Sequence, residues 1–346
     1  MTSPIAWRMP AEWEPHDSTW LTWPKNKTTW PGKLLKQVED VYVRMMLALL
    51  PYEKVNLIVE SSDVAVDVLK RLLFNKGYTT RLIFHKAAAV DTWIRDYGPI
   101  FVKKGRGVAF TKWTFNAWGG KYKDLARDNR VVDKLAALTE FRRFDVPLVL
   151  EGGSIDMNGR GACLTTEQCL LNPNRNPTLS IKEIENRLKK FLGVRKVIWL
   201  KEGIEGDDTD GHVDDIARFV SPDTVITAVE PDRSDKNHVL LEENLKILKS
   251  ATDQDNRRLR VIELPMPGRV GVGRGDTDAD RLPASYANFY IANQTVLVPV
   301  YSHKNDRHAV KILQKTFPDR KVVPIECTAL VYGLGSLHCV TQQQPL

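Results

Sequence analysis

The stretch Gly335-Ser336-Leu337-His338-Cys339-Val340-Thr341-Gln342-Gln343 places a cysteine in a polar setting that begins with glycine. A free cysteine is more often a small buried hydrophobe than a nucleophile, but a packed strand does not select these neighbours. Three more polar segments stand out from the hydrophobic pattern: residues 93–99, 151–153 and 210–214. Each of the three contains Gly or Pro and follows a strand-like segment, so we expect them on loops or strand ends.

These polar segments recur at a regular interval. Asp96, Glu151 and His212 follow one another at about 60 residues, and Cys339 follows after about twice that interval. A degenerate repeat of this length would bring one functional segment from each unit towards a common axis. Sequence identity between the units is negligible, and chance spacing of loops in an α/β fold explains the interval equally well.

Hydrophobic periodicity predicts an α/β fold in which helices and strands alternate. Ser180 and Glu183 have the spacing of a capping box at the start of one helix. No linker of low complexity divides the chain, so we expect a single domain over residues 1–346. The predicted helices are 33–50, 63–74, 123–138, 180–192, 237–250 and 306–316, and the predicted strands are 55–60, 80–84, 147–150, 196–200, 224–229, 258–264, 295–300 and 321–325.

Composition argues against several classes of protein. The chain is 42% hydrophobic and 27% charged, as is usual for globular proteins. Its net charge is +7 without any block of like charges, which gives little support to a nucleic-acid or membrane partner. The longest apolar run, Met45–Leu50, is far shorter than the ~20 residues that cross a bilayer. The four cysteines lack C-x-x-C and zinc-finger spacing, which favours reduced thiols and a cytoplasmic location.

The segment from Gly206 to Asp215 surrounds one imidazole, His212, with carboxylates. A calcium loop of the EF-hand type does not fit, and a zinc site would need further His or Cys ligands, of which none is evident at suitable spacing. A wall that binds an organic cation and an acidic solvated loop remain as alternatives. If the segment is extended, His212 and Asp214 point to one face and Asp215 points away.

A base for Cys339 is expected from a distant loop. In an extended segment the side chain of the adjacent His338 points to the opposite face, so His338 is a poor partner. Of the seven histidines, His212 alone lies among carboxylates in the sequence, and it is the leading candidate.

Asp96, Glu151, His212, Asp214 and Cys339 together form a coherent set. A guanidinium is planar and permanently charged, and its five N–H donors suit carboxylates on its edges. Its carbon is a poor electrophile that a thiolate, assisted by a general acid, can attack. The glycine-rich run 268–275 does not complete G-x-G-x-x-G, and we interpret it as a flexible loop that could act as a lid.

At this point the chain resembles the agmatine deiminases of the guanidino-group-modifying, or pentein, superfamily. The resemblance runs over almost the full length. It is carried by Met9–His16, Trp93–Pro99, Leu150–Ser154, Thr209–Asp214, Leu282–Asn293 and the segment around Cys339. Relatives usually have Gly-Gly-Gly-Asn before Ile-His-Cys, where this chain has Gly333-Leu334-Gly335-Ser336-Leu337.

The resemblance implies a five-bladed α/β propeller of ββαβ units around a central pocket. It also implies roles: Asp96 and Asp214 hold the guanidinium, Glu151 binds it and assists proton transfer, His212 is general acid and base, and Cys339 is the nucleophile. Agmatine would be converted to N-carbamoylputrescine and ammonia, within putrescine and polyamine biosynthesis, without metal or organic cofactor.

For the chain and distal amine of such a small cationic substrate, we expect contacts from Trp93 and Asp208. Whether the chain forms a homodimer or a higher homo-oligomer is left open. Three alternatives remain: a deiminase of free or peptidyl arginine, a metal-dependent hydrolase centred on the His212 segment, and a binding protein without activity.

Overall fold

The computed structural model describes residues 7–271 and 281–346, and within these ranges the strands form five small sheets. Four of the sheets have the same construction. The first two strands form an antiparallel pair, and the third strand joins the second in parallel after a helical connection. Each sheet is therefore one ββαβ unit, as predicted.

These four sheets follow one another in the chain. Their strands are β4 (Ile100–Lys104), β5 (Gly107–Thr114) and β6 (Arg142–Val149); β7 (Asp156–Met157), β8 (Ala162–Thr166) and β9 (Lys196–Leu200); β10 (Ala217–Ser221), β11 (Thr224–Val229) and β12 (Arg260–Pro265); and β13 (Tyr290–Ile291), β14 (Thr295–Val300) and β15 (Lys321–Glu326).

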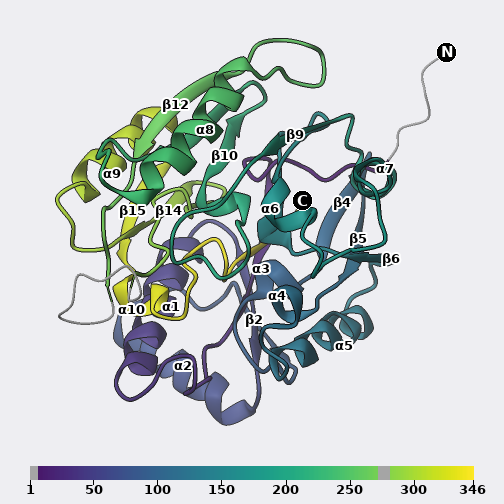
Figure 1. Cartoon of the computed structure of the whole chain (residues 1–346). Helices are drawn as coiled ribbons and strands as arrows, with labels where there is room; N and C mark the ends of the chain where they lie inside the picture. The colour runs from purple at the N-terminus through teal and green to yellow at the C-terminus, as the bar shows by residue number, and fades with distance from the viewer. Residues whose placement is uncertain (1–6, 272–280) are drawn as a thin grey trace.

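The remaining sheet joins the two ends of the chain. Its order is β16 (Gln342–Pro345), β1 (His16–Thr22), β2 (Lys54–Val59) and β3 (Leu82–Lys86). β16 pairs antiparallel with β1, so that Trp20 faces Gln342, whereas β1, β2 and β3 are mutually parallel. The residues directly after Cys339 thus close the ring. In Figure 1 the chain follows this ring, from purple at the bottom through teal on the right and green at the top to yellow. This is the predicted five-bladed pentein propeller.

The longer helices are α1 (Leu34–Leu49), α2 (Ser62–Phe74), α5 (Val131–Leu138), α7 (Ile181–Leu192), α8 (Lys236–Ser250) and α9 (Asp306–Thr316). In Figure 1 they lie around the outside of the ring. α1 buries Val38, Val41, Met45 and Leu49 on one stripe, which is the apolar face of an amphipathic helix. The capping box at Ser180 and Glu183 is present at the start of α7. None of the helices in the described ranges is long and apolar enough to cross a membrane.

Short helical turns occupy several connections between strands. They are α3 (Ile94–Tyr97), α4 (Ala117–Gly120), η1 (Leu125–Arg130), η2 (Gly152–Ser154), α6 (Glu167–Leu170), η3 (Val213–Asp215) and α10 (Thr328–Val331). The structure does not describe residues 272–280, so the second half of the predicted lid at 268–275 lies outside the described residues. The assignment of residues 1–346 to a single domain stays a prediction.

Candidate functional site

The polar segments meet in the structure, but mostly on short helical turns rather than on extended loops. Asp96 lies in α3, Glu151 directly precedes η2, and His212 is the N-cap residue of η3. Cys339 lies in the turn between α10 and β16. The turn η2 packs against both α3 and η3. Loops that follow strands of different blades therefore deliver their carboxylates to one place.

Gly153 marks the point where three of these side chains converge. A Cβ atom added to Gly153 would lie 2.6 Å from His212 Nδ1, 2.9 Å from Asp96 Oδ1 and 3.0 Å from Asp214 Oδ2. Any side chain here would collide with all three groups. Because glycine has none, the backbone leaves a gap over which two carboxylates and an imidazole face each other.

Cys339 is 6% exposed and lines a cavity of about 530 Å³. Its Sγ lies 3.2 Å from Nδ2 of Asn288 and 3.9 Å from Oδ2 of Asp214. Burial raises the pKa of the Cys339 thiol well above its usual value, and the charges of Asp214, Asp215 and Asp96 raise it further. The thiol is therefore protonated at neutral pH unless a cation enters the site.

Asp214 is bonded to a histidine that the sequence did not single out for this purpose. Its Oδ2 lies 2.6 Å from Nδ1 of His338, whose Nε2 lies 2.8 Å from Oε2 of Glu12. Burial raises the pKa of Asp214, but the hydrogen bond and charge of His338, with His212 and Arg218, outweigh it and hold the pKa below its ordinary value. His338 thus orients the carboxylate whose Oδ2 also lies 3.9 Å from Sγ of Cys339. In the structure, therefore, His338 also lies between carboxylates, although none flanks it in the sequence.

The expectation that Asp215 points away from His212 and Asp214 assumed an extended segment, and the structure does not have one here. Val213–Asp215 form a helical turn, so the alternation of an extended strand does not apply. Asp214, Asp215 and Cys339 each bring one ligand atom to within 4.8 Å of the others. Burial, followed by the charges of Asp214, Asp207 and Asp96, raises the pKa of Asp215 well above its ordinary value.

His212 is fixed through its backbone, whereas its ring nitrogens have no hydrogen-bond partner among the described residues. Its backbone N–H donates to Thr209 Oγ1 at 3.1 Å and to Asp207 Oδ2 at 3.2 Å. Its Nδ1 lies 3.7 Å from Oδ1 of Asp96. Burial lowers the pKa of His212 to about 3, although Asp214 opposes the shift. The ring is therefore neutral at pH 7.

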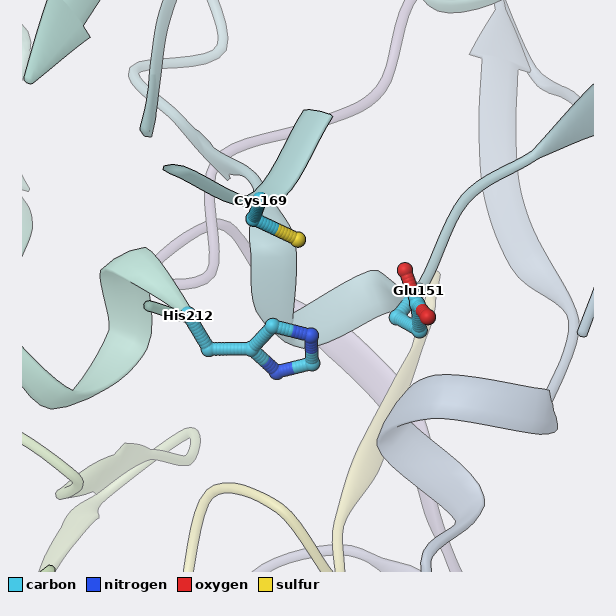
Figure 2. A group of neighbouring side chains, drawn as sticks. All are labelled: Glu151, Cys169 and His212. Atoms are coloured by element: carbon cyan, nitrogen blue, oxygen red, sulfur yellow. The ribbon is translucent and has the colours of Figure 1, made fainter. Parts of the chain in front are cut away.

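Glu151 is fully buried and bound on one side only. Its Oε1 accepts from Nε of Arg175 at 2.7 Å, and Oε2 has no hydrogen-bond partner in the part of the chain that the structure describes. Burial raises the pKa of Glu151, and Arg175 limits the rise. Figure 2 shows the Glu151 carboxylate and the His212 ring turned towards a common space, with Cys169 beside them.

Asp96 is held by two donors and lines the same cavity as Cys339. Its Oδ1 accepts from the backbone N–H of Gly153 and its Oδ2 from Nε1 of Trp118, both at 3.0 Å. Burial, with the charges of Asp214 and Glu151, raises the pKa of Asp96 well above its usual value. Such a cluster of buried carboxylates favours a positively charged ligand, which would relieve their mutual repulsion.

Trp93 and Asp208, which the sequence predicts as contacts for the rest of a substrate, both line the cavity. Trp93 is packed against Trp30, with ring centroids 5.5 Å apart. Asp208 accepts hydrogen bonds from the Tyr122 hydroxyl on its carboxylate and from Lys121 on its backbone oxygen. The cavity therefore has an apolar wall and a carboxylate in addition to the cluster at Gly153.

Sequence reasoning missed several residues that contact the site: Asn288, His338, Arg175, Trp118 and Asp215. Their signal was weak, because single Asn, Arg and Trp residues in apolar or turn-rich stretches are common in globular sequences of any function. Asn288 lies within the segment 282–293 that supports the family resemblance, but no role could be assigned to it there. The sequence also suggested that His212 has no Cys ligand nearby. In the structure, Cys169 lies with His212 and Glu151 in one group whose ligand atoms are within 4.8 Å.

Comparison with known proteins agrees with this geometry. Residues 8–345 match the model of the Porphyromonas-type peptidyl-arginine deiminases. The chain is 40% identical to the agmatine deiminase of Medicago truncatula, over 97% of this chain and 96% of the relative. It is 39% identical to a putative agmatine deiminase of Legionella pneumophila, over 97% and 94%. The solved agmatine deiminase of Enterococcus faecalis superposes with a TM-score of 0.91 at 33% identity, over 98% and 96% of the two chains.

The fold is that of the guanidino-group-modifying penteins. Within that class, the chain belongs to the Porphyromonas-type peptidyl-arginine deiminase family, which includes the agmatine deiminases that it matches along its length.

Proposed function

We propose that this chain is an agmatine deiminase, a hydrolase that converts agmatine and water to N-carbamoylputrescine and ammonia. The observation that carries the proposal is the convergence over Gly153. His212 Nδ1, Asp96 Oδ1 and Asp214 Oδ2 all lie within 3.0 Å of the position that a Cβ atom on Gly153 would occupy. A planar cation placed beside that point receives carboxylates on its edges, and Cys339 lies next to Asp214.

The proposed reaction has two halves, both centred on Cys339. The thiol loses its proton to His212, and Sγ forms a bond to the guanidinium carbon while Asp96, Asp214 and Glu151 hold the N–H groups. The C–N bond to the terminal nitrogen breaks, and His212 returns the proton so that ammonia leaves. Water, deprotonated by His212, then attacks the amidino carbon, and the C–S bond breaks to release the ureido product and the thiol.

The buried carboxylates also account for how a thiol of raised pKa could become a nucleophile. Burial is the largest cause of the raised pKa of the Cys339 thiol, and the charges of Asp214, Asp215 and Asp96 raise this pKa further. A bound guanidinium would neutralise these charges and lower the pKa of the thiol at the moment of binding. In this account the substrate activates its own nucleophile.

The rest of the cavity supports agmatine over arginine. A distal ammonium needs acceptors, and Asp208 and Asp124 line the cavity. An α-carboxylate needs donors, and the lining residues Lys123 and Arg127 are the features that favour free or peptidyl arginine as a second candidate. Arg127 is already paired with Asp124 at 3.0 Å and its side chain is 69% exposed. The described cavity thus offers an α-carboxylate two exposed cations, Lys123 and Arg127, of which Arg127 is partly neutralised.

Ammonia release from agmatine, from arginine and from an arginine-containing peptide, measured side by side, tests the proposal. We expect the value of kcat/KM to be highest for agmatine, with ammonia and carbamoylputrescine formed in equal amounts. Turnover of arginine or the peptide alone would contradict it. Full activity after dialysis against a chelator is expected, whereas a loss restored by Zn²⁺ or Mn²⁺ would favour a metal-dependent hydrolase.

A further inference from the structure

A second thiol lies behind the catalytic histidine and has no part in the proposed reaction. Cys169 lies in the short turn α6 and is fully buried. Its Sγ, one oxygen of Glu151 and one ring nitrogen of His212 lie within 4.8 Å of one another. Figure 2 shows the three side chains, which come from separate connections of the ring, around a common space.

Two of these three side chains carry polar atoms that lack partners in the described structure. Glu151 is 0% exposed and its Oε2 is unpaired, and His212 is 1% exposed with both ring nitrogens unpaired. Buried polar atoms are normally satisfied, so unpaired ones that face a shared space indicate a ligand. Thiolate, imidazole and carboxylate are the ligand types that Zn²⁺ takes in proteins.

We propose that Glu151, Cys169 and His212 form an inhibitory site for Zn²⁺, or for a similar thiophilic divalent cation. Ligand atoms around a tetrahedral Zn²⁺ are about 3.5 Å apart, so side-chain shifts of about 1 Å close the group around the ion. Binding forms a Zn–S bond and releases the Cys169 proton to solvent, while neutral His212 donates a lone pair and Glu151 its free oxygen. The two negative ligands then balance the charge of the ion.

The site makes metal and substrate mutually exclusive. His212 cannot accept or return a proton while a ring nitrogen is bound to Zn²⁺, and Glu151 cannot bind the guanidinium with the same oxygen. Arg175 holds the other carboxylate oxygen, Oε1, at 2.7 Å and leaves Oε2 without a hydrogen-bond partner among the described residues. The inhibition rests on the proposed function, but the binding of the metal does not.

Binding is therefore measured first, in protein that cannot turn over. In the Cys339→Ser variant the other possible ligand group, Asp214, Asp215 and Cys339, has lost its thiol. Calorimetry with Zn²⁺ is expected to show one bound ion, and Co²⁺ is expected to give a thiolate-to-metal absorption band. Cys169→Ala in this background is expected to weaken Zn²⁺ binding more than about 100-fold, beyond the loss that an outer-shell change causes, and to abolish the band.

Cys163→Ala is the matched control, since Cys163 is equally buried but is not in the group. It is expected to leave binding unchanged. Glu151→Gln, tested by binding alone, provides a second variant should Cys169→Ala not fold. The proposed site would be refuted if the Cys339→Ser protein did not bind Zn²⁺, or if Cys169→Ala left Zn²⁺ binding undiminished.

Inhibition is tested in the protein with its nucleophile intact. Zn²⁺ is expected to compete with agmatine and to be reversed by a chelator, while Cys169→Ala keeps the basal turnover and resists the metal at least tenfold better. Equal sensitivity of the Cys169→Ala protein would contradict the proposal. If agmatine is not turned over at all, the proposed function fails, yet the binding measurements still decide the metal site.

Discussion

Nδ2 of Asn288 lies 3.2 Å from Sγ of Cys339, so an amide donor is aimed at the sulfur that we propose as the nucleophile. The Oδ1 atom of the same side chain accepts from the backbone N–H of His338 at 2.9 Å. The amide therefore fixes the loop that carries Cys339 and offers a hydrogen bond that strengthens as the thiol ionises. A hydrogen bond to a charged group contributes about 1.5–3 kcal/mol, and the first prediction follows from this value.

We expect Asn288→Asp to lower kcat by about 10- to 100-fold with a smaller change in KM, since a carboxylate replaces the donor and repels the thiolate. Steady-state kinetics with agmatine measures both parameters. Asn288→Ala separates loss of the donor from added charge and should impair kcat less than the acid does. An unchanged kcat in Asn288→Asp would mean that the contact has no role in the reaction.

Gly153→Ala is expected to abolish more than about 99% of turnover while the protein stays folded. The added methyl would lie 2.6 Å from His212 Nδ1 and 2.9 Å from Asp96 Oδ1 and would fill the space proposed for the guanidinium. Gly107→Ala is the control, because the nearest atom to its added Cβ is 3.4 Å away and it lies in a strand, β5, outside the site. Circular dichroism and kinetics on both variants decide the matter, and an active Gly153→Ala enzyme would refute this placement of the substrate.

Asp214→Asn should make the thiol more reactive and the enzyme less active. After burial, the Asp214 charge is the largest influence that raises the pKa of Cys339, so its removal lowers that pKa. At a fixed neutral pH we expect faster alkylation of Cys339 by iodoacetamide, followed by peptide mass spectrometry, alongside a fall in kcat/KM for agmatine. Slower alkylation would show that Asp214 acts on the thiol in some other way.

Arg175→Met is expected to destabilise the fold by about 3–5 kcal/mol at neutral pH, because it leaves the buried carboxylate of Glu151 without its cation. Burial already raises the pKa of Glu151, and loss of Arg175 raises it further. A raised folded-state pKa favours the protonated folded protein at low pH, and this contribution is lost as pH rises through that pKa. The deficit should therefore be smaller at pH 5 than at pH 8 in urea denaturation, and the double variant with Glu151→Gln should remove the pH dependence. A deficit that grows as the pH falls would contradict the assignment.

Periodicity predicted the longer helices well and the ring only in outline, and it missed strands as long as β1 and β5. The strands Lys196–Leu200, Thr224–Val229 and Thr295–Val300 match β9, β11 and β14, because short apolar runs between turn residues are distinctive. β16 was missed, since Gln342–Gln344 are polar yet buried, and their pairing with β1 depends on residues more than 300 positions away. Strands that meet only through ring closure leave no local pattern.

The site could be predicted from the sequence where a residue type is rare in its context, as at Cys339 and His212. The site could not be predicted from the sequence where the role of a side chain depends on residues that are distant in the chain. His338 has the same flanking residues whether or not Asp214 and Glu12 lie beside it, and the turn at Val213–Asp215 reversed the expectation for Asp215. The folded structure is needed to reveal these contacts.

The central claim is that Cys339 forms the covalent intermediate and that His212 transfers protons in both halves of the reaction. The most direct measurement is mass spectrometry of the protein after it has been quenched with acid during turnover of agmatine and digested. We predict an adduct equal to agmatine less ammonia on the peptide that carries Cys339, and no adduct in the Cys339→Ser protein. An adduct on Cys163, Cys169 or Cys327 instead, or turnover that survives Cys339→Ser, would contradict the account.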